Sequence, residues 1–254
     1  MFKRLQEHSF LFSELVKRDF KKKYKRTYLG MVWSLLSPML TLLVMSIIFT
    51  QFFGRGTPHY TIYLFCGNMV FSFFSDSTNG GMGSLLANSA IFTKINVPKY
   101  LFLFSRNISS LINFGLTLIV FFVFCLFDGI TFTWAFFLLI IPIIFLVIFN
   151  IGIGLILSAL FVFFRDVQYL WSVFTLLIMY MSAIFYDIAS FGDAQKFFYL
   201  NPLFVYIKYF RTIVIDNSIP SLAMHALVVL YAVLAFGIGA LIYKKCNHKF
   251  LYYV

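Results

Sequence analysis

The sequence predicts an all-α integral membrane protein with six transmembrane helices and both termini in the cytoplasm. Of its 254 residues, 61% are hydrophobic and only 11% are charged, whereas a soluble domain carries roughly 25% charged residues. Seven of the ten residues 17–26 are Lys or Arg, and residues 27–54 then contain no Asp, Glu, Lys, Arg or His. A basic block before such a run holds the start of a first transmembrane helix in the cytoplasm.

Composition also limits the domain organisation and the partners. The length leaves little room for a soluble domain, so residues 1–254 are interpreted as a single transmembrane domain. The formal charge is +11, but nine of the 20 basic residues fall within residues 1–26. This clustering indicates attraction to anionic membrane lipids or an acidic partner rather than to nucleic acid. The three cysteines show neither disulfide nor metal-ligand spacing, and no signal-peptide cleavage pattern is present.

The first element is an amphipathic helix at residues 9–26. Phe12, Val16, Phe20 and Tyr24 recur every four residues and share one face, while lysines take the other. A basic amphipathic helix of this kind lies in the membrane interface. It either anchors the chain and sets its topology or offers a docking surface to a cytosolic partner, and the two roles are compatible.

Uncharged runs locate the expected spans. They predict helices at about 30–53, 60–83, 101–127, 133–162, 167–187 and 221–243. The inner loop 84–100 is mixed in polarity and broken by Pro98. Arg165 and Asp166 stand alone between two apolar runs, which predicts a tight inner turn, and Pro142 is a candidate kink in the fourth span. With these spans, 16 basic residues fall inside and four outside, which supports the topology.

The segment 187–220 predicts short re-entrant helices on the outer side, between spans five and six. Its uncharged run, 197–207, has 11 residues and is interrupted by Asn201 and Pro202. Eleven helical residues reach only about 16 Å, which is too short to cross a bilayer. We therefore expect two half-inserted helices hinged at Pro202, buried in protein or lining a cavity.

Asp76 and Arg106 are the charged residues expected nearest the hydrocarbon core. Asp76 lies 16 residues into the second span, which places it roughly 6 Å above the inner boundary, and Arg106 lies about 8 Å above the same boundary. Opposite charges at equal depth are expected to form an intramembrane pair or to share a wet vestibule. The alternative is that each side chain extends separately to the lipid head groups.

No catalytic chemistry is evident in the sequence. The chain has no G-x-x-x-x-G-K-[ST] motif, so it is not expected to bind ATP in the P-loop manner. No nucleophile, metal-ligand or paired-carboxylate signature is found, and the four histidines lie far apart. We therefore expect a non-catalytic protein without a cofactor or metal of its own.

Several segments, in the right order, resemble one family. They are 26–30 with Trp33 and Pro38, 60–74 with 88–98, 150–167 with its ending Phe163-Phe164-Arg165-Asp166-Val167, 182–186, and 200–203 with Arg211. Together they resemble the permease subunits of ABC-2 type polysaccharide exporters, which export O-antigen, capsular polysaccharide or wall teichoic acid. Two departures stand out: Pro98-Lys99-Tyr100 where the family often has Pro-Arg-Glu, and Ala183 where it often has Pro.

The resemblance implies a half-transporter in the bacterial cytoplasmic (inner) membrane. Two copies of the chain would form a homodimeric channel for a lipid-linked glycan, and two copies of a separate ABC ATPase would bind ATP and Mg and dock beneath. It also implies an outer gate formed by Tyr186, Asn201, Pro202 and Arg211.

The short inner loops and the interface helix are the surfaces expected to contact such an ATPase. The candidate coupling residues are Phe20, Lys21, Phe92, Lys94, Pro98, Lys99, Arg165 and Asp166. The alternative for Arg165 is that it only caps the turn and anchors it at lipid head groups.

Aromatic residues make up 21% of the chain, and sugar rings can lie on aromatic faces. Trp171, Phe174 and Phe185 are candidates for a glycan path, although such rings can equally face lipid.

The competing functions are an ABC-2 permease for another amphiphile, such as a drug or glycolipid, and a stand-alone transporter or channel. The latter predicts ionisable residues in mid-membrane and internal repeats, neither of which is found. A membrane-bound enzyme would need a polar catalytic cluster.

Overall fold

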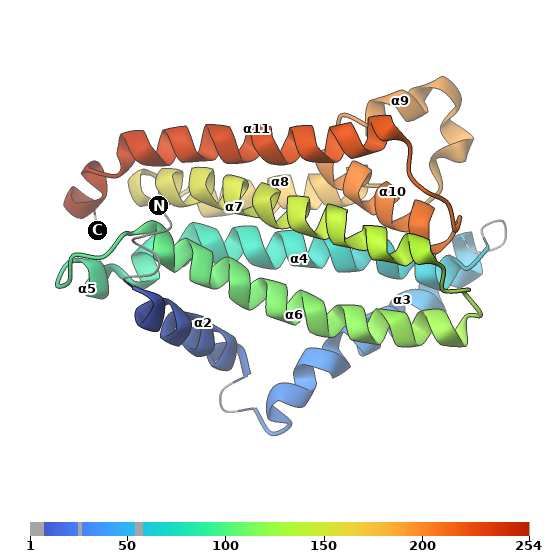
Figure 1. Ribbon diagram of the computed structural model, residues 1–254, viewed down its shortest axis with the longest axis horizontal. Helices are drawn as coiled ribbons and strands as arrows, with labels where there is room; N and C mark the ends of the chain where they lie inside the picture. The colour runs from blue at the N-terminus through green and yellow to red at the C-terminus, as the bar shows by residue number, and fades with distance from the viewer. Residues whose placement is uncertain (1–7, 25–26, 54–57, 254) are drawn as a thin grey trace.

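The computed structural model describes residues 8–24, 27–53 and 58–253, and within these ranges the chain forms helices joined by turns, with no strand (Figure 1). The α-helices are α2 (Ser9–Tyr24), α3 (Trp33–Phe53), α4 (Tyr60–Ala87), α5 (Ser89–Phe92), α6 (Tyr100–Phe127), α7 (Ile140–Phe163), α8 (Val167–Met181), α9 (Gln195–Phe198), α10 (Pro202–Val214) and α11 (Leu222–Cys246). Short 3-10 helices are η1 (Gly30–Val32), η3 (Trp134–Leu139), η4 (Ile188–Ala194) and η5 (Lys249–Tyr252). The predicted all-helical fold is confirmed.

Three helical segments in the described part of the chain are long and apolar enough to cross a membrane: Tyr100–Phe127, Trp134–Phe163 and Leu222–Cys246. Trp33–Phe49 and Val167–Met181 are shorter apolar helices. Together with the composition, these segments describe a multi-pass membrane protein.

Helix α4 is the centre of the bundle. It contacts α3, α6, α7, α8 and α10, and most of its side chains from Tyr60 to Leu85 are buried. Its second half carries Asp76, Asn79 and three glycines, Gly80, Gly81 and Gly83. Neighbouring helices, rather than lipid, surround much of this helix, which explains how it tolerates polar and small residues.

Glycines bring helix backbones into contact. A Cβ atom on Gly152 of α7 would overlap the backbone of Ala235 and Phe236 in α11, and one on Gly239 would overlap the Gly152 carbonyl. Small residues allow this close approach, which is typical of membrane helix pairs. The contact between α7 and α11 is the most extensive between any two elements of the described chain.

The structure corrects one predicted element and refines another. The fifth span was expected at 167–187, but α8 ends at Met181 because the chain turns at Ala183, whose φ is +49°. The fourth span, expected at 133–162, is found at Trp134–Phe163, where residues 134–139 form η3 and the α-helix begins at Ile140. Pro142 therefore lies in the first turn of α7, where proline is tolerated. The end of the predicted interface helix, residues 25–26, lies outside the described residues.

The region between α8 and α11 forms short helices, as expected from its interrupted apolar run. Helix α9 ends at Phe198, and α10 begins at Pro202 with Asn201 as its N-cap, whose side-chain oxygen accepts a hydrogen bond of 3.0 Å from the Leu203 amide. Most of α10 is buried, against α4, α7, η3 and α11.

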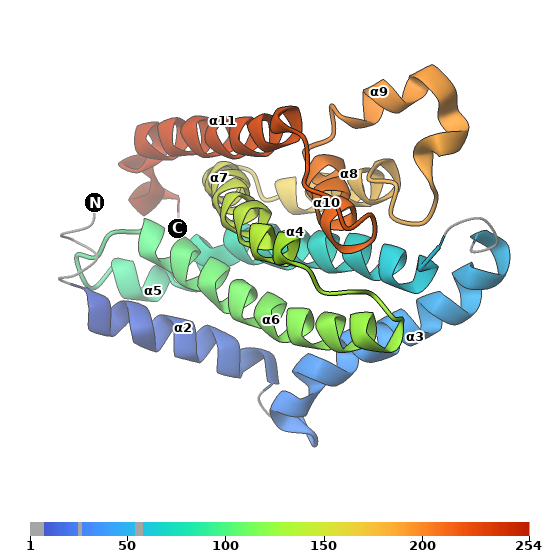
Figure 2. The ribbon, with the colours of Figure 1, turned by 45° about the vertical axis from the view of Figure 1, so that its right-hand side comes forward.

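The two ends of the described chain lie at the same end of the bundle. Figures 1 and 2 show the start of α2, α5 and η5 together at the left, and α9 with the end of α3 at the right. Helix α2 lies along α6, whereas α3 leans away from the bundle as it crosses α4 and α6.

Candidate functional site

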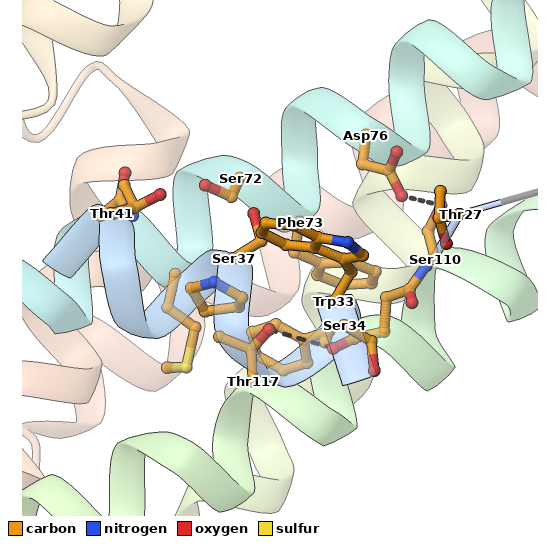
Figure 3. A pocket seen from close by; sticks show the side chains of 15 residues that line it. Thr27, Trp33, Ser34, Ser37, Thr41, Ser72, Phe73, Asp76, Ser110 and Thr117 are labelled. Carbon is orange, nitrogen blue, oxygen red and sulfur yellow. Dashed lines mark hydrogen bonds between the residues drawn. The ribbon is translucent and has the colours of Figure 1, made fainter. Parts of the chain in front are cut away.

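A pocket of about 440 Å³, which we call the hydroxyl-rich pocket, lies between α3, α4 and α6 (Figure 3). Hydroxyl groups line it from all three helices, including Ser34, Ser37 and Thr41 of α3, Ser72 of α4, and Ser110 and Thr117 of α6. Asn68, Asn113 and Asp76 add amide and carboxylate groups, and Trp33, Phe73 and Phe114 add aromatic rings. Such a lining can hydrogen-bond and stack on a hydroxyl-rich, uncharged group.

Asp76, at one end of this pocket, is held by two groups from α6. Arg106 Nη2 lies 3.1 Å from Asp76 Oδ1, and Ser110 Oγ donates to Asp76 Oδ2 at 2.8 Å. The side chains of Arg106 and Asp76 are 23% and 27% exposed. The structure thus brings together the two residues that were expected to pair because they lie at equal depth in the membrane.

Gly80 makes room for this ion pair. A Cβ atom at that position would overlap Arg106 Nε, so the guanidinium lies directly against the backbone of α4. By contrast, a Cβ atom on Gly83, one turn further along, would meet no atom within 4 Å.

A second polar centre surrounds Arg211, which is only 5% exposed. Its guanidinium donates to the carbonyls of Ala183 at 2.9 Å, Ile184 at 3.1 Å and Tyr63 at 3.1 and 3.3 Å. It also lies 3.3 Å from the centroid of the Tyr63 ring, a cation–π geometry. Arg211 therefore fastens the turn at residues 182–186, which we call the α8 turn, to α4.

Other predicted gate residues meet the same turn. Asn201 Nδ2 donates to Ser182 Oγ at 2.9 Å, and the Tyr186 carbonyl accepts from Tyr63 Oη at 2.6 Å. Pro202 is the first residue of α10. The structure thus gathers Tyr186, Asn201 and Arg211 around one turn.

The residues predicted to couple to an ATPase separate into exposed and packed groups. Lys21, Lys94, Arg165 and Asp166 are exposed, while Phe20 and Pro98 are half-buried. Phe92 is buried. Lys99 Nζ donates to the Asn247 carbonyl at 2.8 Å and lies 5.8 and 5.7 Å from the Phe92 and Phe250 rings. This burial lowers the pKa of the Lys99 ammonium, and Phe92 and Lys99 are thereby packed near the C-terminal segment.

The three candidate glycan-path rings do not form one surface. Trp171 is buried and lies 5.9 Å from Phe74 and 5.6 Å from Phe174, between ring centroids. Phe174 is half exposed on the outside of α8. Phe185 stacks on Phe49 of α3 with centroids 4.8 Å apart.

Sequence reasoning missed the hydroxyl-lined pocket. Its polar residues recur at helical spacing, with Ser34, Ser37 and Thr41 on α3, Asn68, Ser72 and Asp76 on α4, and Ser110, Asn113 and Thr117 on α6. Steps of three or four residues place each set on one helix face. That periodicity of polar residues within apolar spans was the available signal.

Comparisons with known proteins agree on one family. The family model described as "ABC-2 type transporter" matches residues 11–215. Two relatives, both described as "O-antigen export system permease protein RfbA", are each 30% identical to this chain. The one from Myxococcus xanthus aligns over 114 residues, 45% of this chain and 44% of the relative. The one from Klebsiella pneumoniae aligns over 125 residues, 48% of each. The chain thus matches about half the length of these relatives. Because the family model covers most of the sequence, the chain belongs to the ABC-2 type transporter family.

Proposed function

We propose that this chain is the channel-forming permease subunit of an ABC transporter that exports a lipid-linked polysaccharide across the bacterial cytoplasmic membrane. ATP hydrolysis in a separate nucleotide-binding subunit drives the export. The observation that carries this proposal is the similarity to two O-antigen export permeases within the ABC-2 type family. The glycan is a cell-surface polymer such as O-antigen, capsule or teichoic acid.

The chemistry of the α3–α4–α6 pocket supports a carbohydrate substrate. Its hydroxyl and amide groups offer hydrogen bonds to sugar hydroxyls, and Trp33 and Phe73 offer ring faces. A drug-like amphiphile offers few hydrogen-bonding partners for so many hydroxyl and amide groups, which favours the glycan over the alternative substrate class of another amphiphile.

The proposed arrangement is a homodimer whose subunits cross the membrane six times, with both termini in the cytoplasm and α9 and α10 dipping in from the outside. Helices α3 and α8 carry the faces available for the second subunit or for lipid. Their exposed apolar residues include Met39, Leu43 and Ile47 on α3 and Leu170, Val173 and Leu177 on α8.

The direct test is export in cells. Deleting the gene should remove the glycan from the cell surface while its lipid-linked form accumulates inside, and the wild-type gene should restore export. A partner ATPase with a disabled P-loop lysine should give the same accumulation. Normal surface glycan in the deletion strain would contradict the proposal, and loss of drug resistance alone would favour the alternative amphiphile.

The coupling surface has its own test. Replacing Arg165 or Asp166, both exposed in the α7–α8 turn, with Ala should reduce export while ATP hydrolysis by the purified complex continues. Lys244→Ala, near the end of α11, is the control for losing a charge elsewhere. Normal export in both turn variants would show that Arg165 and Asp166 do not couple ATP hydrolysis to export.

A further inference from the structure

A second pocket, of about 590 Å³, lies between α2, α4 and α6. Its charged lining consists of Arg18, Asp19 and Lys22 of α2 and Arg106 of α6. The Asp76–Arg106 ion pair stands between the two pockets, because Asp76 lines the hydroxyl-rich pocket and Arg106 lines this one. We call this second cavity the basic pocket.

Positive charge dominates the basic pocket. Three cations and one carboxylate line it. Arg18 donates to Asp19 Oδ1 through Nε at 3.0 Å and Nη2 at 2.7 Å, and Asp19 Oδ2 accepts from Ser105 Oγ at 3.3 Å. These contacts hold Arg18 beside α6. A guanidinium has five N–H donors, so Arg18 and Arg106 both keep donors beyond those bound to their carboxylates.

On the α4 side, the pocket is open at Gly83, between the side chains of Asn79 and Ala87. Gly80 and Gly83 both line it, and a Cβ atom on Gly83 would meet nothing within 4 Å. A ligand can therefore approach the α4 backbone between the cations of α2 and Arg106. Arginine and lysine around an open space of this kind are the groups that bind phosphate.

We propose that the basic pocket binds the phosphate or diphosphate group of a lipid, with Arg18, Lys22 and Arg106 as its cationic ligands. The site is enclosed by α2, the basic helix expected at the membrane interface, where phosphate groups of lipids lie. Arg106 can reorient from Asp76 toward the phosphate, because both groups lie at the boundary between the two pockets. A sugar attached to that phosphate would then be next to the hydroxyl-rich pocket.

The choice of lipid rests on the proposed function, whereas the phosphate chemistry does not. Two lipids carry this group at the inner surface: the carrier lipid of the glycan and an ordinary anionic phospholipid. The hydroxyl-rich pocket beyond Asp76 favours the carrier, because a bulk phospholipid offers no sugar ring for it.

Binding is tested with the purified chain in neutral detergent, together with its ATPase where the two co-purify, using fluorescently labelled farnesyl diphosphate as the probe. Unlabelled farnesyl diphosphate should displace the probe, and farnesol should do so about tenfold less well or worse, because it lacks the charged group. The double variant Arg18→Gln/Lys22→Gln should weaken binding about tenfold or more.

A matched variant separates the site from general charge. Lys17→Gln/Lys245→Gln also removes two positive charges, but from residues that do not line the pocket. This variant should bind the probe within about twofold of wild type. Gly83→Phe fills the pocket without changing any charge and should also abolish binding. Phosphatidylglycerol that competes equally with farnesyl diphosphate would identify a phospholipid site, and weak competition would identify the carrier.

The proposal is overturned if farnesol competes as well as the diphosphate. It is equally overturned if Arg18→Gln/Lys22→Gln and Gly83→Phe both bind like wild type. The assay involves no export, so it can fail while the deletion strain still loses its surface glycan, and it can succeed if that strain keeps it. The two proposals are therefore tested independently.

Discussion

Two arginines lie against glycines of the same central helix, but their surroundings differ. Arg211 lies beside Gly67, whose added Cβ would be 3.1 Å from Nη2, and is buried among main-chain carbonyls. Arg106 lies against Gly80, is partly exposed, and contacts a carboxylate at the wall between two pockets. Carbonyls enclosed in the fold cannot be replaced by a ligand, whereas a carboxylate partner beside a pocket can be exchanged. Arg211 is therefore a fixed structural fastening, whereas Arg106 is placed to exchange its partner.

The largest effect is expected at the fixed arginine. Arg211→Met removes hydrogen bonds to three carbonyls and leaves those carbonyls buried, which should cost about 3 kcal/mol or more of folding free energy. Arg211→Lys should restore little of this folding free energy, because an ammonium lacks the planar set of N–H donors of a guanidinium. Both are measured by thermal unfolding in detergent and by the yield of monodisperse protein. Lys208→Met, in the same helix, is the control, and equal stability of the two Met variants would contradict the fastening role.

A smaller effect is expected from displacing Arg106 without altering its charge. Gly80→Ala places a methyl group where Arg106 now lies and should cost about 1–2 kcal/mol, despite the helix propensity gained by alanine. Gly83→Ala gains the same propensity in open space and should be neutral or slightly stabilising. Thermal unfolding and export activity are measured for both variants. If the two alanines behave alike, Arg106 is not confined by α4.

The ion pair itself is tested by exchange of charges. Asp76→Arg and Arg106→Asp should each impair export or assembly, and the double variant should recover part of the loss, with a coupling energy of about 1 kcal/mol. Recovery is measured by surface glycan and by membrane-inserted protein. A double variant no better than the worse single variant would show that the two side chains act separately.

The smallest effect is expected at Tyr63. Tyr63→Phe removes the hydroxyl that donates to the Tyr186 carbonyl at 2.6 Å but keeps the ring beside Arg211, so it should cost about 1 kcal/mol. Tyr180→Phe, whose exposed ring lies on α8, serves as the control in the same unfolding assay. A loss as large as that of Arg211→Met would mean that the hydroxyl, rather than the guanidinium, holds the α8 turn.

The sequence predicted the features that depend on local pattern. Uncharged runs located the helices to within a few residues at α4, α6 and α11, because a helix that is buried in lipid or protein needs a long run of apolar residues. The pairing of Asp76 with Arg106 followed from counting residues along two helices, since a helix rises uniformly. The end of α8 did not follow, because nothing in residues 182–186 announces a positive φ at an alanine.

Contacts between distant segments were the least predictable. The acceptors of Arg211 include the Tyr63 carbonyl, 148 positions away in the chain, and a carbonyl carries no residue-specific signal. The basic pocket likewise joins α2 to residues of α4 and α6 that the sequence separates by more than 50 positions. Only the fold reveals that the basic helix faces two glycines rather than solvent alone.

The glycine contact between α7 and α11 has a mechanical consequence. The backbones of α7 and α11 touch at Gly152 and Gly239, so the two helices cannot slide along each other without a steric clash and are expected to move as one rigid unit. At the C-terminal end of this unit, the Asn247 carbonyl accepts a hydrogen bond from Lys99, in the loop before α6. We therefore expect a push on that loop to be transmitted along the length of the bundle to the end where α10 and the α8 turn lie.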